Sequence, residues 1–246
     1  MGVKEIIILI LVGAGASFVQ RVTGFGQGIF AMLFLPHFLP SPTAAVTVST
    51  LFSSVTTTYN SIKYRKDISF PTILPVLVGT MVAVPIAVYF SGKISGEAFS
   101  VILGIVLILL SLYFIFWGQK IQLKPTLPKG ALAGFCGGTL NGLFATGGPP
   151  VVLYLTNATT ESHVYFASIQ FYFAFTNAYA VIFRIINGLI TPQVLLFSAV
   201  SLLGCMMGDF AGSKLFSKLN GTLLKRIIYI TMILSGIVLI ANNAGI

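Results

Sequence analysis

Charged side chains are scarce in this sequence, and acidic ones are the scarcest. Only 8% of the 246 residues are charged, against roughly 25% in a soluble domain. Asp and Glu number 5 and Lys and Arg 14, while 56% of the residues are hydrophobic. Water is therefore not the main solvent of this chain. Its cations lie in short clusters between apolar segments, which is typical of a membrane protein and argues against nucleic-acid binding.

Cysteines and catalytic motifs are also sparse. Cys136 and Cys205 lie in apolar segments with no CxxC spacing, so we expect two buried free thiols and no metal site. The chain has no HExxH or GxSxG motif, no phosphate loop and no Ser-His-Asp set. We therefore expect neither an enzyme nor a cofactor. His37, before a Pro-Ser-Pro turn, and His163, after Glu161, are interpreted as loop residues.

Apolar runs of about 20 residues recur along the chain, and each can cross a ~30 Å hydrocarbon core as a helix. The first run, 6–22, follows Lys4 as a signal peptide would. No polar mature domain comes after it, so we interpret it as retained. Longer helices are expected at 43–62, 71–90, 98–117, 163–186, 192–213 and 223–242. The sequence predicts an all-α polytopic membrane protein.

The chain repeats itself at an offset of 121 residues, which becomes 125 after a four-residue insertion. The offsets pair Gly13 with Gly134, Gln20 with Asn141, Gly26 with Gly147, Lys63 with Arg184, Pro71 with Pro192, Gly79 with Gly204, Lys93 with Lys218 and Ser111 with Gly236. We divide the chain into an N-terminal transmembrane repeat (1–119), a polar, Pro-containing linker (120–128) and a C-terminal transmembrane repeat (129–246). Each repeat has a Gly/Pro-broken helical segment and three longer transmembrane helices.

Loop charges distinguish parallel from inverted repeats. With an even number of crossings per repeat, the 13 loop cations divide 8 against 5. With an odd number they divide 10 against 3, and only Lys4, Lys93 and Arg184 face the minority side. Because cations gather in cytoplasmic loops, we favour inverted repeats with the basic loops in the cytoplasm and both termini outside it. The count does not distinguish eight helical elements from ten.

Both repeats open with a break, GFGQG at 24–28 and TGGPP at 146–150. Irregular backbone in lipid leaves N–H and C=O groups unpaired at a cost on the order of several kcal/mol each, so it must line a cavity or pack against protein. Helices beginning at Gly28 and Pro149 would aim their N-terminal N–H groups at an anion, and inverted symmetry would bring the two N-termini together. The alternative is that the glycines only permit close helix packing and the prolines only bend helices.

Polar residues near the breaks complete a candidate anion site. The substrate-binding residues expected are Gln20, Arg21, Gly24, Gly26, Gln27, Gly28, Asn141, Thr146, Gly147, Gly148, Pro149, Gln170 and Asn177. Arg21 either contacts the anion or snorkels to the membrane surface. Gln170 and Asn177 lie two turns apart on one helix face.

Other polar residues allow both a structural and a functional interpretation. Ser49, Ser53, Thr56 and Thr57 occupy comparable places in the first repeat, and we interpret most such hydroxyls as structural. Asp209 is the best candidate for an intramembrane acid that couples transport to protons. Lys214 and Lys218 follow it closely, so an ion pair is the competing interpretation.

The paired glycine-rich motifs, Gly24-Phe25-Gly26-Gln27-Gly28 and Gly147-Gly148-Pro149-Pro150, resemble those of the TauE/SafE family of bacterial membrane permeases over nearly the whole chain. The resemblance implies an exporter of sulfite, sulfoacetate or other organosulfonates in the cell inner membrane. Gln27 stands where members of the family often carry another glycine, and it adds an amide to the site. Which anion is carried, and in which direction, is left open.

The expected mechanism is alternating access, in which one repeat rocks against the other around an anion held between the breaks. The expected partners are a small anion and the lipid bilayer, with no nucleic acid, and the oligomeric state is open. One alternative function is a channel-like anion pore, whose flux would not saturate. Another is a non-transporting membrane subunit or scaffold, which would copurify with a partner.

Overall fold

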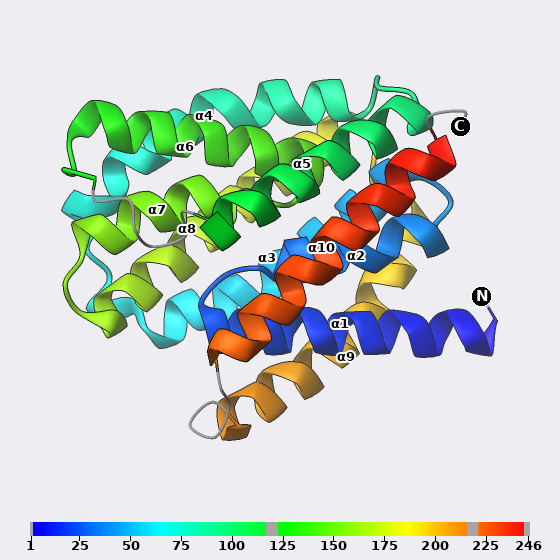
Figure 1. Ribbon diagram of the computed structural model, residues 1–246, viewed down its shortest axis with the longest axis horizontal. Helices are drawn as coiled ribbons and strands as arrows, with labels where there is room; N and C mark the ends of the chain where they lie inside the picture. Colours follow the sequence, from blue (N-terminus) through cyan, green and yellow to red (C-terminus); the bar gives the residue numbers. More distant parts are fainter. Residues whose placement is uncertain (1, 117–122, 216–220, 244–246) are drawn as a thin grey trace.

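The structure is a computed structural model that describes residues 2–116, 123–215 and 221–243, without the side chains of 215 and 221–228 (Figure 1). All regular structure in these residues is helical. The helices are α1 (Val3–Thr23), α2 (Gln27–Phe38), α3 (Pro42–Lys63), α4 (Phe70–Ser91), α5 (Gly96–Phe116), α6 (Leu127–Phe144), α7 (Gly148–Ala158), α8 (Ser162–Ile186), α9 (Pro192–Leu215) and α10 (Gly221–Asn243), with a short 3-10 turn, η1 (Arg65–Asp67). The all-α prediction is confirmed, and the broken segments are pairs of helices.

Local signals explain where the helices begin and end. The Ser41 hydroxyl accepts a hydrogen bond from the Ala44 N–H at 3.1 Å and caps α3, and Pro42 follows in its first turn. The repeat-related Pro71 and Pro192 lie in the first turns of α4 and α9. All six longer helices predicted from sequence are present, with ends within two residues of the prediction.

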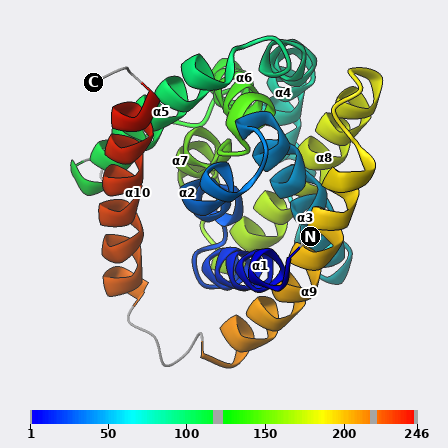
Figure 2. The ribbon, with the colours of Figure 1, turned by 90° about the vertical axis from the view of Figure 1, so that its right-hand side faces the viewer.

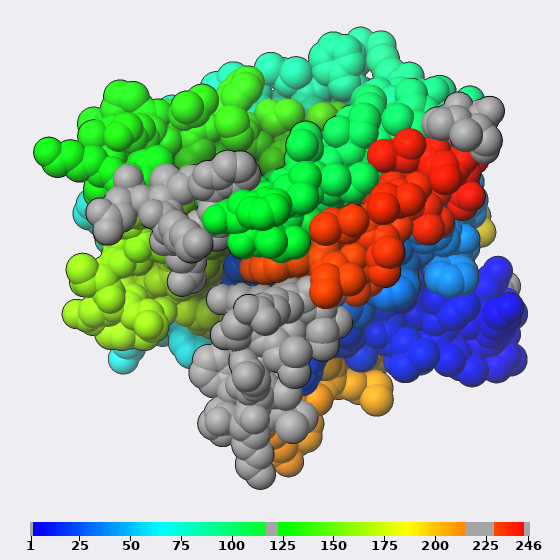
Figure 3. All heavy atoms as spheres, viewed as in Figure 1, coloured from blue at the N-terminus to red at the C-terminus, as the bar shows by residue number. Residues whose placement is uncertain are grey.

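Five helices of the described residues are long and apolar enough to span a membrane: α1, α4, α5, α8 and α9. α3 is not among them, because its Ser- and Thr-rich sequence lowers its hydropathy. Many large apolar side chains are exposed, on α4 and α9 as well as on α5 and α10, which run side by side over one face of the molecule (Figure 3). Lipid rather than water suits such a surface.

The helices pack in pairs that join one half of the chain to the other. α1 packs along α9 and α6 along α4, while α3 packs on α8 and α5 on α10. By the repeat offsets, α1 corresponds to α6, α3 to α8, α4 to α9 and α5 to α10. Exchanging corresponding helices turns the α1–α9 pair into the α6–α4 pair, and it leaves the α3–α8 and α5–α10 pairs unchanged. In the end-on view, α2, α3 and α7 lie in the interior of the molecule (Figure 2). The division into sequence repeats stays a prediction.

Repeat-related glycines bring these helices into close contact. A Cβ at Gly13 of α1 would overlap the carbonyl oxygen of Ser201 on α9, and one at Gly204 would overlap that of Ile10. The equivalent glycines bring α6 and α4 together in the same way, with Gly134 against the Val76 carbonyl and Gly79 against the Ala131 carbonyl. Close backbone approach through small residues is the usual means of helix association in membranes.

Some expectations about individual residues are wrong. Cys205 is buried, but Cys136 lies on the exposed face of α6. His37 is in the last turn of α2 and His163 in the first turn of α8, so neither is a loop residue. α6 begins at Leu127, with Pro128 in its first turn, so the helix starts inside the predicted linker of residues 120–128.

Candidate functional site

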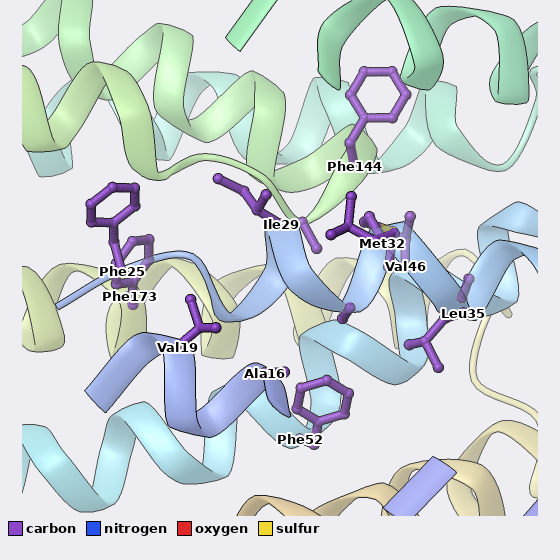
Figure 4. Close-up of a cluster of buried hydrophobic side chains, with 14 of the residues drawn as sticks. Ala16, Val19, Phe25, Ile29, Met32, Leu35, Val46, Phe52, Phe144 and Phe173 are labelled. Atoms are coloured by element: carbon purple, nitrogen blue, oxygen red, sulfur yellow. The ribbon is translucent and has the colours of Figure 1, made fainter. Parts of the chain in front are cut away.

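The two breaks touch each other in the middle of the protein. Gly24 caps the C-terminus of α1 and Ala145 that of α6, and these repeat-related residues have positive φ angles of 83° and 56°. α2 then begins at Gln27 and α7 at Gly148, each one residue before the predicted start. A Cβ at Gly28 would overlap the Ala145 carbonyl oxygen, so the N-terminus of α2 lies directly against the second break. α2 is buried among α1, α3 and the end of α6 (Figure 4).

A small cavity of about 20 Å³ lies between the breaks. It has room for about one water molecule. Its lining brings together Gln20 and Asn141, the repeat-related amides, and no charged side chain of the described residues lines it. The lining residues are Gln20, Gly26, Gln27, Gly28, Ile29, Ser53, Thr57, Asn141, Ala145, Thr146, Gly148, Phe173 and Asn177.

Amide side chains of α1, α6 and α8 form two hydrogen-bonded pairs at this cavity. Gln20 Nε2 donates to Gln170 Oε1 at 3.0 Å, and Gln170 Nε2 donates to the Gly24 carbonyl at 3.1 Å. Asn141 Nδ2 donates to Asn177 Oδ1 at 3.1 Å. An amide nitrogen carries two N–H donors, so these groups are held in place with further donors to offer.

Two hydroxyls at the cavity are buried without a hydrogen-bond partner. They belong to Ser53 of α3 and Thr146 of the second break. An unpaired buried polar group costs roughly 1–3 kcal/mol, so this arrangement fits a site that a polar ligand completes. The sequence predicted Thr146 at the site and grouped Ser53 and Thr57 with hydroxyls that are mostly structural, and the Thr57 hydroxyl does donate to the Ser53 carbonyl at 2.6 Å. Both line the cavity, and the spacing of four residues that puts them on one face of α3 was the available signal.

The Gln27 amide is largely engaged with protein. Its Nε2 donates to Ser17 Oγ at 3.3 Å and to Cys205 Sγ at 3.7 Å, and its Oε1 accepts from the Thr56 hydroxyl at 3.0 Å. These bonds tie the start of α2 to α1, α3 and α9. The side chain that departs from the family motif therefore braces the site more than it offers donors to it.

The glycines of the second break have different roles. Gly147 packs against Gly137 and Asn141 of α6, and neither it nor Pro149 lines the cavity. Gly148 does line it, and a Cβ there would lie 3.3 Å from the Phe25 ring and 3.4 Å from the Phe173 ring. Close packing thus accounts for Gly147, the alternative that the sequence left open.

A vestibule of about 760 Å³ lies on one side of the cavity. Gly24 and Phe25 line it, whereas the next residue, Gly26, lines the cavity. Phe25 therefore lies where the two spaces adjoin, next to Phe173 (Figure 4). The rest of the lining comes mainly from the end of α1, from α7, and from the connection between α7 and α8 with the start of α8, with Arg21, Val22, Thr23, Tyr64, Val152, Thr156, Asn157, Thr159, Thr160, Glu161, Ser162, His163, Tyr165, Phe166 and Ser213.

The vestibule carries Arg21 and a basic rim. Arg21 Nη2 donates to the Tyr64 hydroxyl at 3.0 Å, its guanidinium lies 5.8 Å from the centres of the Tyr64 and Phe166 rings, and its Nη1 is buried without a partner. The exposed cations nearest in sequence to the lining residues are Lys63, Arg65, Lys66 and Lys214. These cations outnumber the acidic residues Glu161, which lines the hollow and pairs with His163, and Asp67, which follows Lys66, so the net positive charge attracts anions.

Comparison with known proteins shows the family of this chain. The family model described as sulfite exporter TauE/SafE matches residues 9–239. The chain belongs to the TauE/SafE family. No curated protein and no solved structure matches it. The TauE/SafE protein is thus a multi-pass membrane transporter of the sulfite and anion exporter type, and not an enzyme.

The structure also places two further charged residues of this TauE/SafE protein that the sequence singled out. Arg184 is not a loop cation, because its side chain is fully buried on α8. Without it, the loop cations divide ten against two. Asp209 is half-buried on α9 and does not line the cavity. Lys214, its expected partner, instead has Nζ 4.3 Å from the centre of the Phe210 ring, and Lys218 lies outside the described residues.

Proposed function

We propose that this TauE/SafE protein binds a small sulfur oxyanion or organosulfonate, such as sulfite or sulfoacetate, between its two breaks and exports it by alternating access. The observation that carries the proposal is the cavity, where the unpaired Ser53 and Thr146 hydroxyls face the amides of Gln20 and Asn141. Hydroxyl and amide N–H donors suit an oxyanion, and the N-termini of α2 and α7 add partial positive charge.

The size of the cavity supports a gated site. A space of about 20 Å³ holds about one water and no oxyanion, so the breaks must separate to admit substrate. Phe25 and Phe173 are the side chains that would have to move for the vestibule to reach the cavity. A plugged, closed site favours a transporter over an open pore, and the basic vestibule favours transport over a scaffold role.

The orientation we propose puts the vestibule in the cytoplasm and the protein in the inner membrane. The vestibule is lined by the end of α3 and the start of α8, which lie at the opposite side of Figure 1 from the start of α1 and the end of α10. The exposed cations next in sequence to its lining residues are Lys63, Arg65, Lys66 and Lys214, which fits the positive-inside rule and inverted repeats. A negative interior then favours anion exit by ~2.3 kcal/mol per charge per 100 mV.

Thermal unfolding of the detergent-purified protein tests the binding claim. Sulfite, thiosulfate, sulfate, sulfoacetate, taurine and chloride are compared at fixed ionic strength, because a ligand that binds the native state raises the midpoint. We expect one or two sulfur anions to raise it, and Asn141→Ala to weaken their apparent affinity at least about tenfold. Cys136→Ala, an exposed change on the same helix, is the matched control. No selective shift in the wild type, or equal shifts in both variants, would contradict the proposal.

A further inference from the structure

Arg184 is a fully buried guanidinium without an acidic partner among the described residues, and it is the largest side chain buried to this degree. Nη1 donates to Thr47 Oγ1 at 3.1 Å and Nη2 to the Gly142 carbonyl at 2.7 Å. Both acceptors are neutral. Nε has no partner, and a guanidinium has five N–H donors, so several remain unused.

The surroundings compensate this charge only in part. Gly142 lies in the last turn of α6, and Arg184 itself lies in the last turn of α8. The C-terminal ends of helices carry roughly half a negative charge each. Dipoles of this kind stabilise a cation, but they do not replace the counterion that a buried charge ordinarily has. The structure therefore holds a buried positive charge that an anion could neutralise.

Arg184 lies beyond the cavity from the vestibule, as the order of residues along α3 indicates. α3 ends next to Tyr64, which lines the vestibule. Thr57 and Ser53, which line the cavity, lie further back along α3, more than one turn before its end. Thr47, which accepts the hydrogen bond from Arg184, is near the opposite end of the helix. On α8, Asn177 lines the cavity and precedes Arg184 by seven residues, about 10 Å along a helix.

Unpaired hydroxyls extend from the cavity toward Arg184. Ser49 and Ser53 lie one turn apart on the same face of α3, and both hydroxyls are buried without a partner. Ser53 lines the cavity, and Ser49 lies one turn further along α3 toward the level of Thr47, although Thr47 itself is on another face of the helix, about 200° around from Ser49. Polar groups left unpaired at successive turns fit a route along which a polar solute is passed.

We propose that Arg184 is a second anion-binding group, which receives the sulfonate or sulfite oxygens on the exit side of the cavity. This inference rests on the proposed function and extends it. The forked guanidinium suits an oxyanion, because two of its N–H groups can bond two oxygens at once. Arg21 at the vestibule and Arg184 beyond the cavity would then flank a central site that has no charged side chain.

The competing role is a structural one, in which Arg184 merely holds α3, α6 and α8 together. The two roles predict opposite effects of Arg184→Met on the purified protein. Removing an uncompensated buried charge should raise the thermal midpoint measured without anions, whereas removing a structural tie should lower it. Efflux of sulfite from proteoliposomes, scaled to the amount of folded protein, is the second readout.

We expect Arg184→Met to raise the anion-free midpoint and to reduce sulfite efflux at least about tenfold. Lys93→Met, at an exposed cation between α4 and α5, is the matched control. Efflux within about twofold of wild type, or a lowered midpoint with unchanged efflux per folded protein, would overturn the proposal.

Arg184→Lys covers the case in which the methionine variant does not fold, because it keeps the charge and loses the fork. We expect it to fold and to raise the KM for sulfite at least about threefold, and an unchanged KM would overturn the proposal. Failure of the Arg184 proposal can be distinguished from failure of the proposed central site. If Asn141→Ala abolishes binding while the Arg184 variants behave as wild type, the central site stands and the second site does not.

Discussion

At the scale of single residues, the repeat carried the useful information. It linked Gln20 with Asn141, and the structure puts both amides at one cavity. Ser53 could not be distinguished in this way, because helical serines often bond their own backbone and the sequence does not say which hydroxyl is left unpaired. The buried position of Arg184 was missed for a related reason: it comes just before a polar loop, and only packing against α3 and α6 reveals its burial.

The role of Phe25 as a barrier leads to a prediction about access. In a Cys136→Ala background, a cysteine replacing Thr146 reports on water-soluble thiol reagents that enter the cavity from the vestibule. Phe25→Ala should speed its modification at least roughly tenfold, equivalent to a barrier lowered by about 1.4 kcal/mol. Phe30→Ala, which removes a ring of α2 that packs on Phe34 instead, should leave the rate unchanged. Equal rates of thiol modification with and without Phe25→Ala would rule out Phe25 as the barrier.

At the scale of helices, sequence reasoning predicted lengths well and contacts poorly. Glycines and prolines mark where a helix must begin or end, so both breaks were found to within one residue. The same glycines carry no information on what they touch. Gly28 and Gly147 belong to corresponding breaks, yet Gly28 meets the other repeat whereas Gly147 meets its own α6. That difference depends on tertiary packing.

The close contact of α1 with α9 predicts a large effect of one added side chain. Gly204→Val would place a Cβ on the Ile10 carbonyl oxygen, and backbone cannot yield as a side chain can. We expect it to destabilise the protein by about 1–3 kcal/mol, as overpacking does elsewhere, and to lower the midpoint in detergent. Met206→Val on the same helix, 67% exposed, is the control. Equal midpoints for the two variants would argue against this packing.

At the scale of the whole molecule, composition and charge were enough to predict a multi-pass helical membrane protein, but not how its parts interlock. The sequence suggested two successive units. The sequence did not indicate how these units pack, and the structure pairs α1 with α9 and α4 with α6, so each unit packs mainly on the other. Long-range pairing of this kind has no signature in a single hydropathy pattern. Rocking of the units would accordingly involve helices from both.

The proposed orientation predicts opposite accessibility at two exposed lysines. Lys66, beside the vestibule, should be cytoplasmic, and Lys93, between α4 and α5, should face the other side. In intact cells of a Cys136→Ala strain, an impermeant thiol reagent should label Lys93→Cys and leave Lys66→Cys unmodified. Both should react after permeabilisation. Labelling of Lys66→Cys alone in intact cells would reverse the orientation, and with it the proposed direction of transport.

The central claim is that a small sulfur anion crosses the membrane by binding between the two breaks. The most direct test is the initial rate of sulfite efflux from proteoliposomes as a function of the sulfite concentration inside. We predict a rate that saturates, supports counterflow and falls at least about tenfold in Asn141→Ala, with Cys136→Ala unchanged. A rate that rises linearly without counterflow, or that is the same in Asn141→Ala as in wild type, would contradict the account.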